Sequence, residues 1–202
     1  MHAMDCKKGG FVSKRHDKVK NTLANMLNDV AYDVRIEPHL QPLSGEIFNF
    51  QTTNREDDAR LDISARGFWN KNEMAFFDVR VFNPFAKSYM NTSLDTLFKS
   101  NENAKKREYN QRVIDIEHGT FTPIVLSAYG GYGRETNRFI SEMVNKLSEK
   151  KDIPTSVISN YVRTKLSFEL IRAQVMCIRG SRKLWSCKID TDEVEVVHCA
   201  SV

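Results

Sequence analysis

The stretch from Arg60 to Phe82 constrains the fold of this chain more than any other. It reads as two strands, 60–67 and 74–82, joined by a polar turn. Along the second strand apolar residues occur on both faces, which predicts a central strand that is covered on both sides, because side chains alternate along a strand. Asp78 and Arg80 share one of these faces. A charge there is costly unless it is paired or bound to a metal, so Asp78 needs a partner.

Two interpretations of Asp78 are open from these residues alone. The carboxylate forms a buried ion pair with Arg80, or it joins Asp62, near the start of the hairpin, in binding a divalent cation. Carboxylate oxygens are suitable ligands for Mg²⁺. The hairpin by itself does not decide between the two.

Helices and strands alternate along the rest of the chain. Apolar residues three and four apart predict an amphipathic helix from about Ser13 to Val30, whose basic N-terminal end could contact a phosphate. The other predicted elements are a strand at 32–36, a charged helix at 94–116, a strand at 121–127, a helix after the Gly-rich turn 128–134, and a long helix from Pro154 to Gly180. This order predicts an α/β fold with a mixed sheet flanked by helices. The Gly-rich turn lacks the Lys-Ser/Thr of a P-loop, which favours a plain turn over a nucleotide site.

The length of 202 residues predicts one domain with a sizeable core. We divide the chain into an N-terminal arm at 1–12, a core at 13–150, a helix that packs on the core at 151–182, and a tail or edge strand at 183–202. The side of the long helix that we expect to be buried carries Val157, Ile158, Tyr161, Val162, Leu166, Leu170, Ile171 and Val175.

Charge and composition limit the classes of protein to which this chain can belong. The net charge of +4 is modest, but the cations cluster at 7–20, 99–112 and 163–188. Such clusters indicate either a phosphate-binding surface or solvated helix faces. We expect an intracellular protein with reduced thiols and no contact with a membrane, because there is no signal peptide, no apolar run of about 20 residues, and no disulfide-like spacing among the four cysteines.

Several short motifs occur in one order along the chain. They are His2-x3-Cys6 with Gly9-Gly10, Arg15-His16-Asp17, Glu37-Pro38, Arg60-Leu61-Asp62, Asp78, and Lys105 with Tyr109. In this order the set resembles the restriction-like endonuclease domain, of the PD-(D/E)xK type, in non-LTR retrotransposon and related reverse-transcriptase polyproteins. The resemblance implies a restriction-endonuclease-like α/β core with a C-terminal helical extension.

The resemblance also implies a role for individual residues. Asp62 and Asp78 would bind Mg²⁺ or Mn²⁺, with Glu37 as a weaker third ligand. Lys105 would be the catalytic lysine, supported by Tyr109 and Arg80. The residues that would contact DNA are Lys14, Arg15, His16, Arg60, Lys106 and Arg112, of which Arg15, His16 and Arg60 could instead brace the site.

The chain departs from the family pattern at three positions. Leu61 and Asp17 stand where the family has Pro and Asn. Arg80 occupies the usual Lys position, and an arginine cannot act as a base at neutral pH. Which of Lys105, Lys106 and Arg80 is the catalytic cation therefore stays open.

The function that the resemblance implies is a nuclear, metal-dependent endodeoxyribonuclease that nicks target DNA for retrotransposon integration by target-primed reverse transcription. Its partners would be DNA and an upstream reverse transcriptase of the same polyprotein. His2 and Cys6 would be half of a Zn²⁺ knuckle whose other half lies upstream, so we expect a piece of a longer protein. The alternatives are a catalytically decayed, domesticated nucleic-acid-binding domain, a branched-DNA-selective nuclease, and a structural partner-binding domain. The sequence leaves the target and the oligomeric state open.

Overall fold

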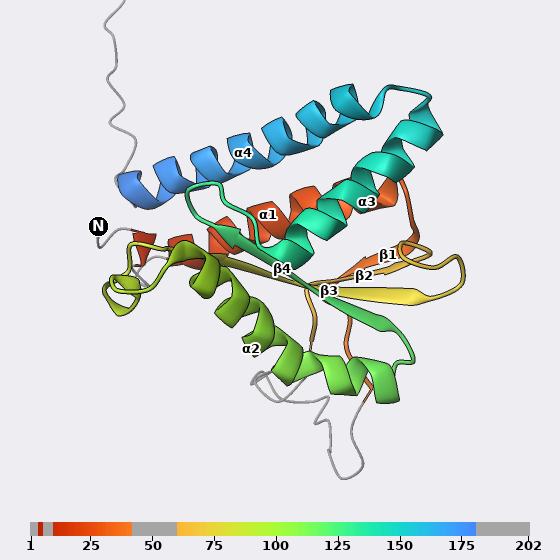
Figure 1. The fold of residues 1–202 in the computed structure, drawn as a ribbon, viewed down its shortest axis with the longest axis horizontal. Helices are drawn as coiled ribbons and strands as arrows, with labels where there is room; N and C mark the ends of the chain where they lie inside the picture. Colours follow the sequence, from red (N-terminus) through yellow and green to blue (C-terminus); the bar gives the residue numbers. More distant parts are fainter. Residues whose placement is uncertain (1–3, 6–9, 42–59, 181–202) are drawn as a thin grey trace, which may run out of the picture.

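The computed structural model describes residues 4–5, 10–41 and 60–180 (Figure 1). Its elements are α1 (Phe11–Asn28), β1 (Tyr32–Ile36), β2 (Ile63–Arg66), β3 (Met74–Phe82), the short 3-10 helix η3 (Lys87–Tyr89), α2 (Leu94–Asp115), β4 (Thr120–Ser127), α3 (Arg134–Lys151) and α4 (Thr155–Arg179). The helices and strands expected in these ranges are all present. The fold is therefore α/β, as the order of elements predicts.

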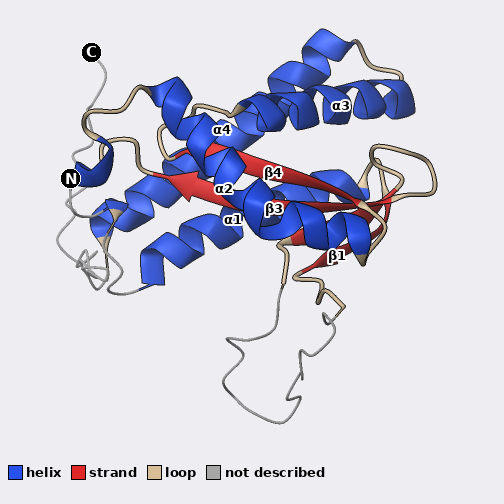
Figure 2. Ribbon diagram, turned by 60° about the horizontal axis from the view of Figure 1, so that its bottom comes forward, coloured by secondary structure: helices blue, strands red, loops and turns tan. Residues whose placement is uncertain are grey.

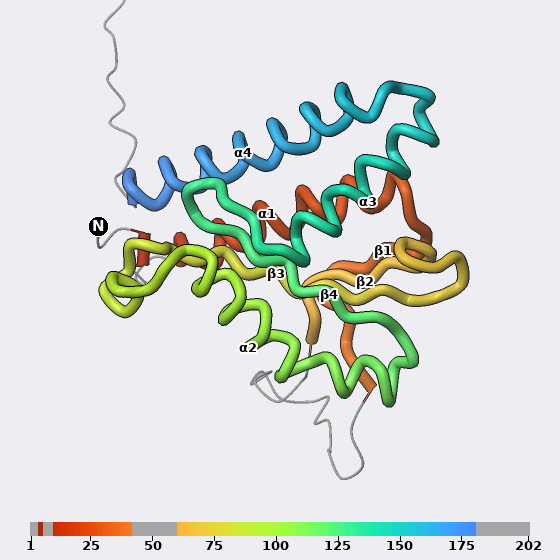
Figure 3. Tube along the Cα trace, viewed as in Figure 1, coloured from red at the N-terminus to blue at the C-terminus, as the bar shows by residue number. Residues whose placement is uncertain are grey.

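The four strands form one mixed sheet in the order β1-β2-β3-β4. β1 and β2 are antiparallel, β2 and β3 form the expected hairpin, and β4 runs parallel to β3. The chain leaves β3, passes through α2 on one face of the sheet, and returns as β4 (Figure 3). β3 is therefore an interior strand, as its two apolar faces predict.

Helices cover both faces of this sheet (Figure 2). α1 and α3 pack on one face, α2 packs on the other, and α4 lies across α1 and α3 as an outer layer (Figure 1). The largest core cluster lies between the sheet and α1, α3 and α4, and it contains Phe68, Phe77 and Phe139 within 5.4 Å of one another, centroid to centroid. Smaller clusters under α2 include Phe76 and Phe82, from the opposite face of β3.

Burial along α4 differs from the expectation. Ile158, Val162, Leu166 and Leu170 are buried, but Val157, Tyr161, Ile171 and Val175 are exposed. A helix with apolar residues on all sides does not reveal which side faces its core, because the spacing that identifies a buried stripe is present on both sides. The buried side was thus predicted only in part.

The outer edge of β4 is closed by the segment that follows it. The Thr136 hydroxyl donates to the Val125 carbonyl at 3.0 Å, and it accepts from the Val125 N–H at 2.7 Å. The Gly133 N–H also donates to the Val125 carbonyl, and Leu126 forms a bridge with Tyr132. The turn at 128–133 and the start of α3 therefore satisfy backbone groups that an edge strand would otherwise leave unpaired.

Some predictions fall outside the described residues. These are the zinc half-site at His2 and Cys6 and the tail or edge strand at 183–202. Among the described residues, Cys177 is the free cysteine. None of the described helices is long and apolar enough to cross a membrane.

Candidate functional site

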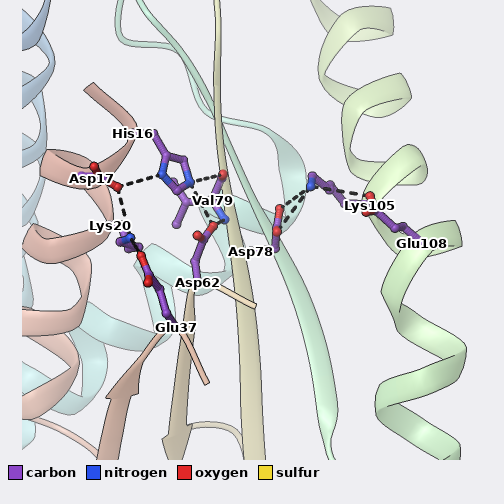
Figure 4. A network of polar contacts seen from close by, with 9 residues as sticks. All are labelled: His16, Asp17, Lys20, Glu37, Asp62, Asp78, Val79, Lys105 and Glu108. Carbon is purple, nitrogen blue, oxygen red and sulfur yellow. Dashed lines mark hydrogen bonds and ion pairs between the residues drawn. The ribbon is translucent and has the colours of Figure 1, made fainter. Parts of the chain in front are cut away.

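A cavity of about 450 Å³ lies between the N-terminal part of α1 and the middle of α2, over β3. The polar and charged side chains that line it are His16, Asp62, Asp78, Arg80 and Lys105, together with Ser13. Three of the residues expected to act together, Asp62, Asp78 and Lys105, thus border one space (Figure 4).

Asp62 immediately precedes β2, and its carboxylate is held by two donors. The Val79 N–H donates to Oδ2 at 2.6 Å, and Nε2 of His16 lies 3.0 Å from the same oxygen. The backbone contributes as well, because the Asp62 N–H donates to the Phe77 carbonyl at 3.2 Å. The start of the hairpin and the first turns of α1 together fix the orientation of this carboxylate.

His16 connects α1 to both strands of the hairpin. Its Nε2 lies 2.9 Å from the Val79 carbonyl oxygen as well as 3.0 Å from Asp62 Oδ2. Both neighbours accept hydrogen bonds, so Nε2 carries the proton and donates. Burial alone would lower the pKa of His16, but the hydrogen bond and the charge of Asp62 outweigh it and raise the pKa above its ordinary value.

Asp78 projects from β3 toward α2, and its side chain is only 8% exposed. The Lys105 ammonium donates to Oδ1 at 3.3 Å and lies 3.1 Å from Oδ2. Burial raises the pKa of Asp78 to about 6; Lys105 opposes this rise, and the negative charge of Asp62 adds to it.

Lys105, and not Arg80, is the cation that pairs with Asp78. Arg80 lies two residues further along β3 and borders the same cavity. It forms no ion pair with Asp78 in the described structure. Asp78 Oδ2 is buried and accepts no hydrogen bond of good geometry from the described residues, although the ammonium is near. This oxygen therefore keeps capacity for a further electrostatic partner.

The two carboxylates have different partners on different helices. Figure 4 shows Asp62 turned toward His16 on α1 and Asp78 turned toward Lys105 on α2, with β3 between them. Their coupling is visible in the effect of Asp62 on the pKa of Asp78. Within the described residues, no group of three or more His, Cys, Asp or Glu side chains is placed to hold a metal ion. An ion here would rely on two carboxylates and on backbone or water oxygens.

A second polar network lies beside the first, and the sequence reading missed its central residue. Lys20 is buried, one helical turn after His16, and its ammonium lies 2.5 Å from Glu37 and 3.1 Å from Asp17. Glu37, the weaker metal candidate, is thus paired with Lys20 and does not border the cavity in the described structure. The i, i+4 spacing of His16 and Lys20 was the available signal.

Arg15 is turned into the fold, where it contacts backbone carbonyls and none of Asp62, Asp78 and Lys105 among the described residues. Its side chain is buried, and its guanidinium donates to the carbonyls of Met4 at 3.1 Å and Val81 at 3.3 Å. It therefore cannot present its charge to DNA in this arrangement. Its neighbour Lys14 is exposed, with its ammonium 5.3 Å from the Phe11 ring.

The remaining expected residues on α2 have partners within the chain. Lys106 pairs with Glu135 at 2.5 Å, and Arg112 donates to the Gln41 carbonyl at 2.6 Å. Tyr109 packs on Phe121 and lies under the Lys105 ammonium, which is 5.2 Å from its ring centroid. Burial raises the pKa of Tyr109, so it stays a neutral phenol beside the site. Arg60, two positions before Asp62 in the sequence, is partly buried and pairs through its backbone with His39.

No protein-family model matches this chain, and no curated protein matches it either. The fold and the site define its class: an α/β protein with a four-stranded mixed sheet, in which two aspartates of the β2–β3 hairpin and a lysine of α2 border one cavity.

Proposed function

We propose that this protein is a divalent-metal-dependent DNA endonuclease with a restriction-endonuclease-like core, which nicks target DNA for retrotransposon integration. The observation that supports this most directly is the set formed by Asp62, Asp78 and Lys105 on one cavity, with Asp78 buried and its pKa raised to about 6. Carboxyl groups with raised pKa values in a cleft are typical of catalytic sites.

The residues present fit a hard divalent cation. Asp62 and Asp78 supply carboxylate oxygens, the ligands that Mg²⁺ and Mn²⁺ prefer, and Asp78 Oδ2 is a buried oxygen that lacks a hydrogen bond from the described residues. When bound, such an ion would supply a Lewis acid and an activated water.

The chain's own side chains would prepare the site for this chemistry. His16 and the Val79 N–H fix the Asp62 carboxylate, and the Lys105 ammonium holds Asp78. Lys105 and Arg80 together place two positive charges at the cavity, where a phosphodiester would develop negative charge. Lys105 is the better candidate for the catalytic cation, because it contacts the acid directly.

DNA is the substrate under this proposal, and a reverse transcriptase in the same polyprotein would extend the 3′ hydroxyl that a nick leaves. The proposal places the protein in the nucleus. It also assigns Lys14, on the exposed side of α1, to contact with the phosphate backbone.

The test is nicking of supercoiled plasmid DNA with Mg²⁺ or Mn²⁺. We expect Asp62→Asn and Asp78→Asn each to reduce the nicking rate by about 10² or more, because each removes a charged ligand whose partners stay in place. Glu149→Gln, at an exposed position near the end of α3, is the matched control and should nick like the unmodified protein. Equal activity in all four proteins would remove the proposal.

A decayed domain that binds nucleic acid without cutting it is the second candidate. It is favoured by the protein partners that both acids already have, His16 for Asp62 and Lys105 for Asp78. Calorimetry with Mn²⁺ separates the two functions. A nuclease must bind Mn²⁺, and the substitution Asp78→Asn must weaken that binding. A protein that shows salt-dependent DNA affinity but no binding of millimolar Mn²⁺ is the decayed form.

A further inference from the structure

The outward side of α4 carries a long apolar stripe that the described chain does not cover. α4 packs on α1 and α3 through Ile158, Val162, Leu166, Leu170, Ala173 and Cys177. Its opposite side points away from the sheet, at the upper border of the molecule in Figure 1. The residues that we call the outer stripe are Val157, Tyr161, Phe168, Ile171, Val175 and Ile178, and each is 45–66% exposed.

The spacing of the outer stripe is that of a coiled-coil seam. Together with the exposed Thr164, its residues follow one another at alternating intervals of four and three from Val157 to Ile178. This 3.5-residue period keeps a seam facing a second helix, whereas a contact with lipid requires no such period. The pattern therefore indicates a helix as the occupant.

Charges beside the outer stripe repeat every seven residues on one flank. Lys165, Arg172 and Arg179 form this cationic flank. Two of them have contacts within α4, since the Lys165 ammonium lies 3.2 Å from the Tyr161 hydroxyl and Arg172 lies 2.9 Å from Glu169. The contact with the neutral Tyr161 hydroxyl leaves the Lys165 charge in place. The Arg172–Glu169 pair is at the surface, where such pairs contribute little to stability, so a carboxylate of a partner can replace Glu169 at little cost.

The other flank is neutral, and it is formed by Asn160, Ser167 and Gln174. Gln174 donates to the Ala128 carbonyl, so this flank lies beside the turn at 128–133.

A second copy of α4 would not satisfy this charge pattern. In a parallel pair, residues of the cationic flank meet the neutral flank of the partner. In an antiparallel pair, cations would meet cations. Neither arrangement forms an ion pair across the seam, whereas acidic residues on a partner helix would form one with each cation.

We propose that the outer stripe of α4 binds an amphipathic helix of another protein, which carries acidic residues along its apolar seam. Burial of the stripe supplies affinity, and the cationic flank selects the partner by charge. This inference does not depend on the nuclease proposal, because it uses none of the residues around the cavity.

The probe is a labelled synthetic peptide of four heptads, with Leu at the seam and Glu at the flanking positions, measured by fluorescence anisotropy at low salt. A twin peptide with Lys in place of Glu tests the charge rule. We expect the full chain to bind the Glu peptide about tenfold or more tightly than the Lys peptide. Phe168→Glu with Ile171→Glu should abolish binding, because charges then interrupt the stripe.

A charge reversal provides the sharper test, since it leaves the apolar residues in place. In the variant Lys165→Glu, Arg172→Glu, Arg179→Glu the preference should invert toward the Lys peptide. The control reverses three exposed cations away from α4's outer side, Lys99→Glu, Arg107→Glu and Lys150→Glu, and should keep the original preference.

Three outcomes would overturn the inference. The first is equal binding of both peptides, or none, by a protein whose circular dichroism shows it folded. The second is a dimer of the unmodified protein in sedimentation that is lost in the variant Phe168→Glu with Ile171→Glu. A second copy of the chain would then be the occupant. The third is stripe-dependent binding to vesicles of phosphatidylcholine and phosphatidylserine, which would make a membrane surface the occupant.

Discussion

At the scale of single residues, two neighbouring cations on α1 differ in their surroundings. Lys14 is exposed, and Arg15 is 2% exposed with its guanidinium on the carbonyls of Met4 and Val81. Sequence spacing did not separate them, because a buried arginine and a solvated one look alike until the elements around them are placed. The contacts of Arg15 tie the N-terminal residues to β3.

Replacing Arg15 with methionine should therefore lower the free energy of unfolding by about 1–3 kcal/mol, since buried carbonyls would lose a charged donor. Lys14→Met is the matched control and should change stability by less than about 0.5 kcal/mol. Urea unfolding of both variants measures the difference. Equal effects would show that Arg15 has no bracing role.

The raised pKa of Asp78 predicts a pH-dependent stability. In the unfolded chain this carboxyl titrates near 3.8, and in the fold it titrates at about 6. Protonation thus favours the fold, and the associated stability is present below about pH 4 and is lost as the pH rises through about 6. The difference between the two pKa values corresponds to about 3 kcal/mol.

We expect Asp78→Asn, measured without divalent ions, to gain stability relative to the unmodified protein as the pH rises from about 4 to about 8, by up to about 3 kcal/mol. Urea unfolding across this range is the measurement. Glu149→Gln, at an exposed position, is the matched control for the loss of one carboxylate and should show no such gain. The absence of a gain for Asp78→Asn as well would mean that burial does not shift its titration.

At the scale of elements, one hydroxyl contacts both backbone groups of Val125 at the edge of β4. Thr136 both donates to and accepts from Val125, so Thr136→Val keeps the shape and leaves a buried N–H without its partner. We expect a loss of about 1–3 kcal/mol in the free energy of unfolding. Thr164→Val, at an exposed position on α4, should be nearly neutral. Thermal or urea unfolding of the two variants measures the difference. Equal stability of Thr136→Val and Thr164→Val would contradict the role of the Thr136 hydroxyl.

Periodicity located the elements but not the surroundings of each. The α3 residues Phe139, Ile140, Met143, Val144 and Leu147 form one buried stripe, which its apolar spacing identifies because α3 has a polar opposite side. α4 has none, so half of its expected core is exposed. Which side of α4 faces outward depends on how α4 packs against α1 and α3, and the sequence of α4 alone does not determine that packing.

At the scale of the whole molecule, the sequence was sufficient to place the hairpin and to predict the burial of Asp78. Alternation along β3 predicted that Asp78 would be buried and would need a partner, and Lys105 provides it. The two links from His16, to Asp62 and to the Val79 carbonyl, could not be read from the sequence. They depend on how α1 crosses the hairpin, which no local pattern determines.

The crossover from β3 through α2 to β4 also sets an order of assembly during synthesis. β3 cannot meet its parallel neighbour until residues 83–119 have emerged, because these separate the two strands along the chain. Lys105 lies within that same segment. On a ribosome, a nascent chain that stops before residue 120 would therefore leave one side of β3 unpaired, and the fourth strand would be the step that completes the sheet.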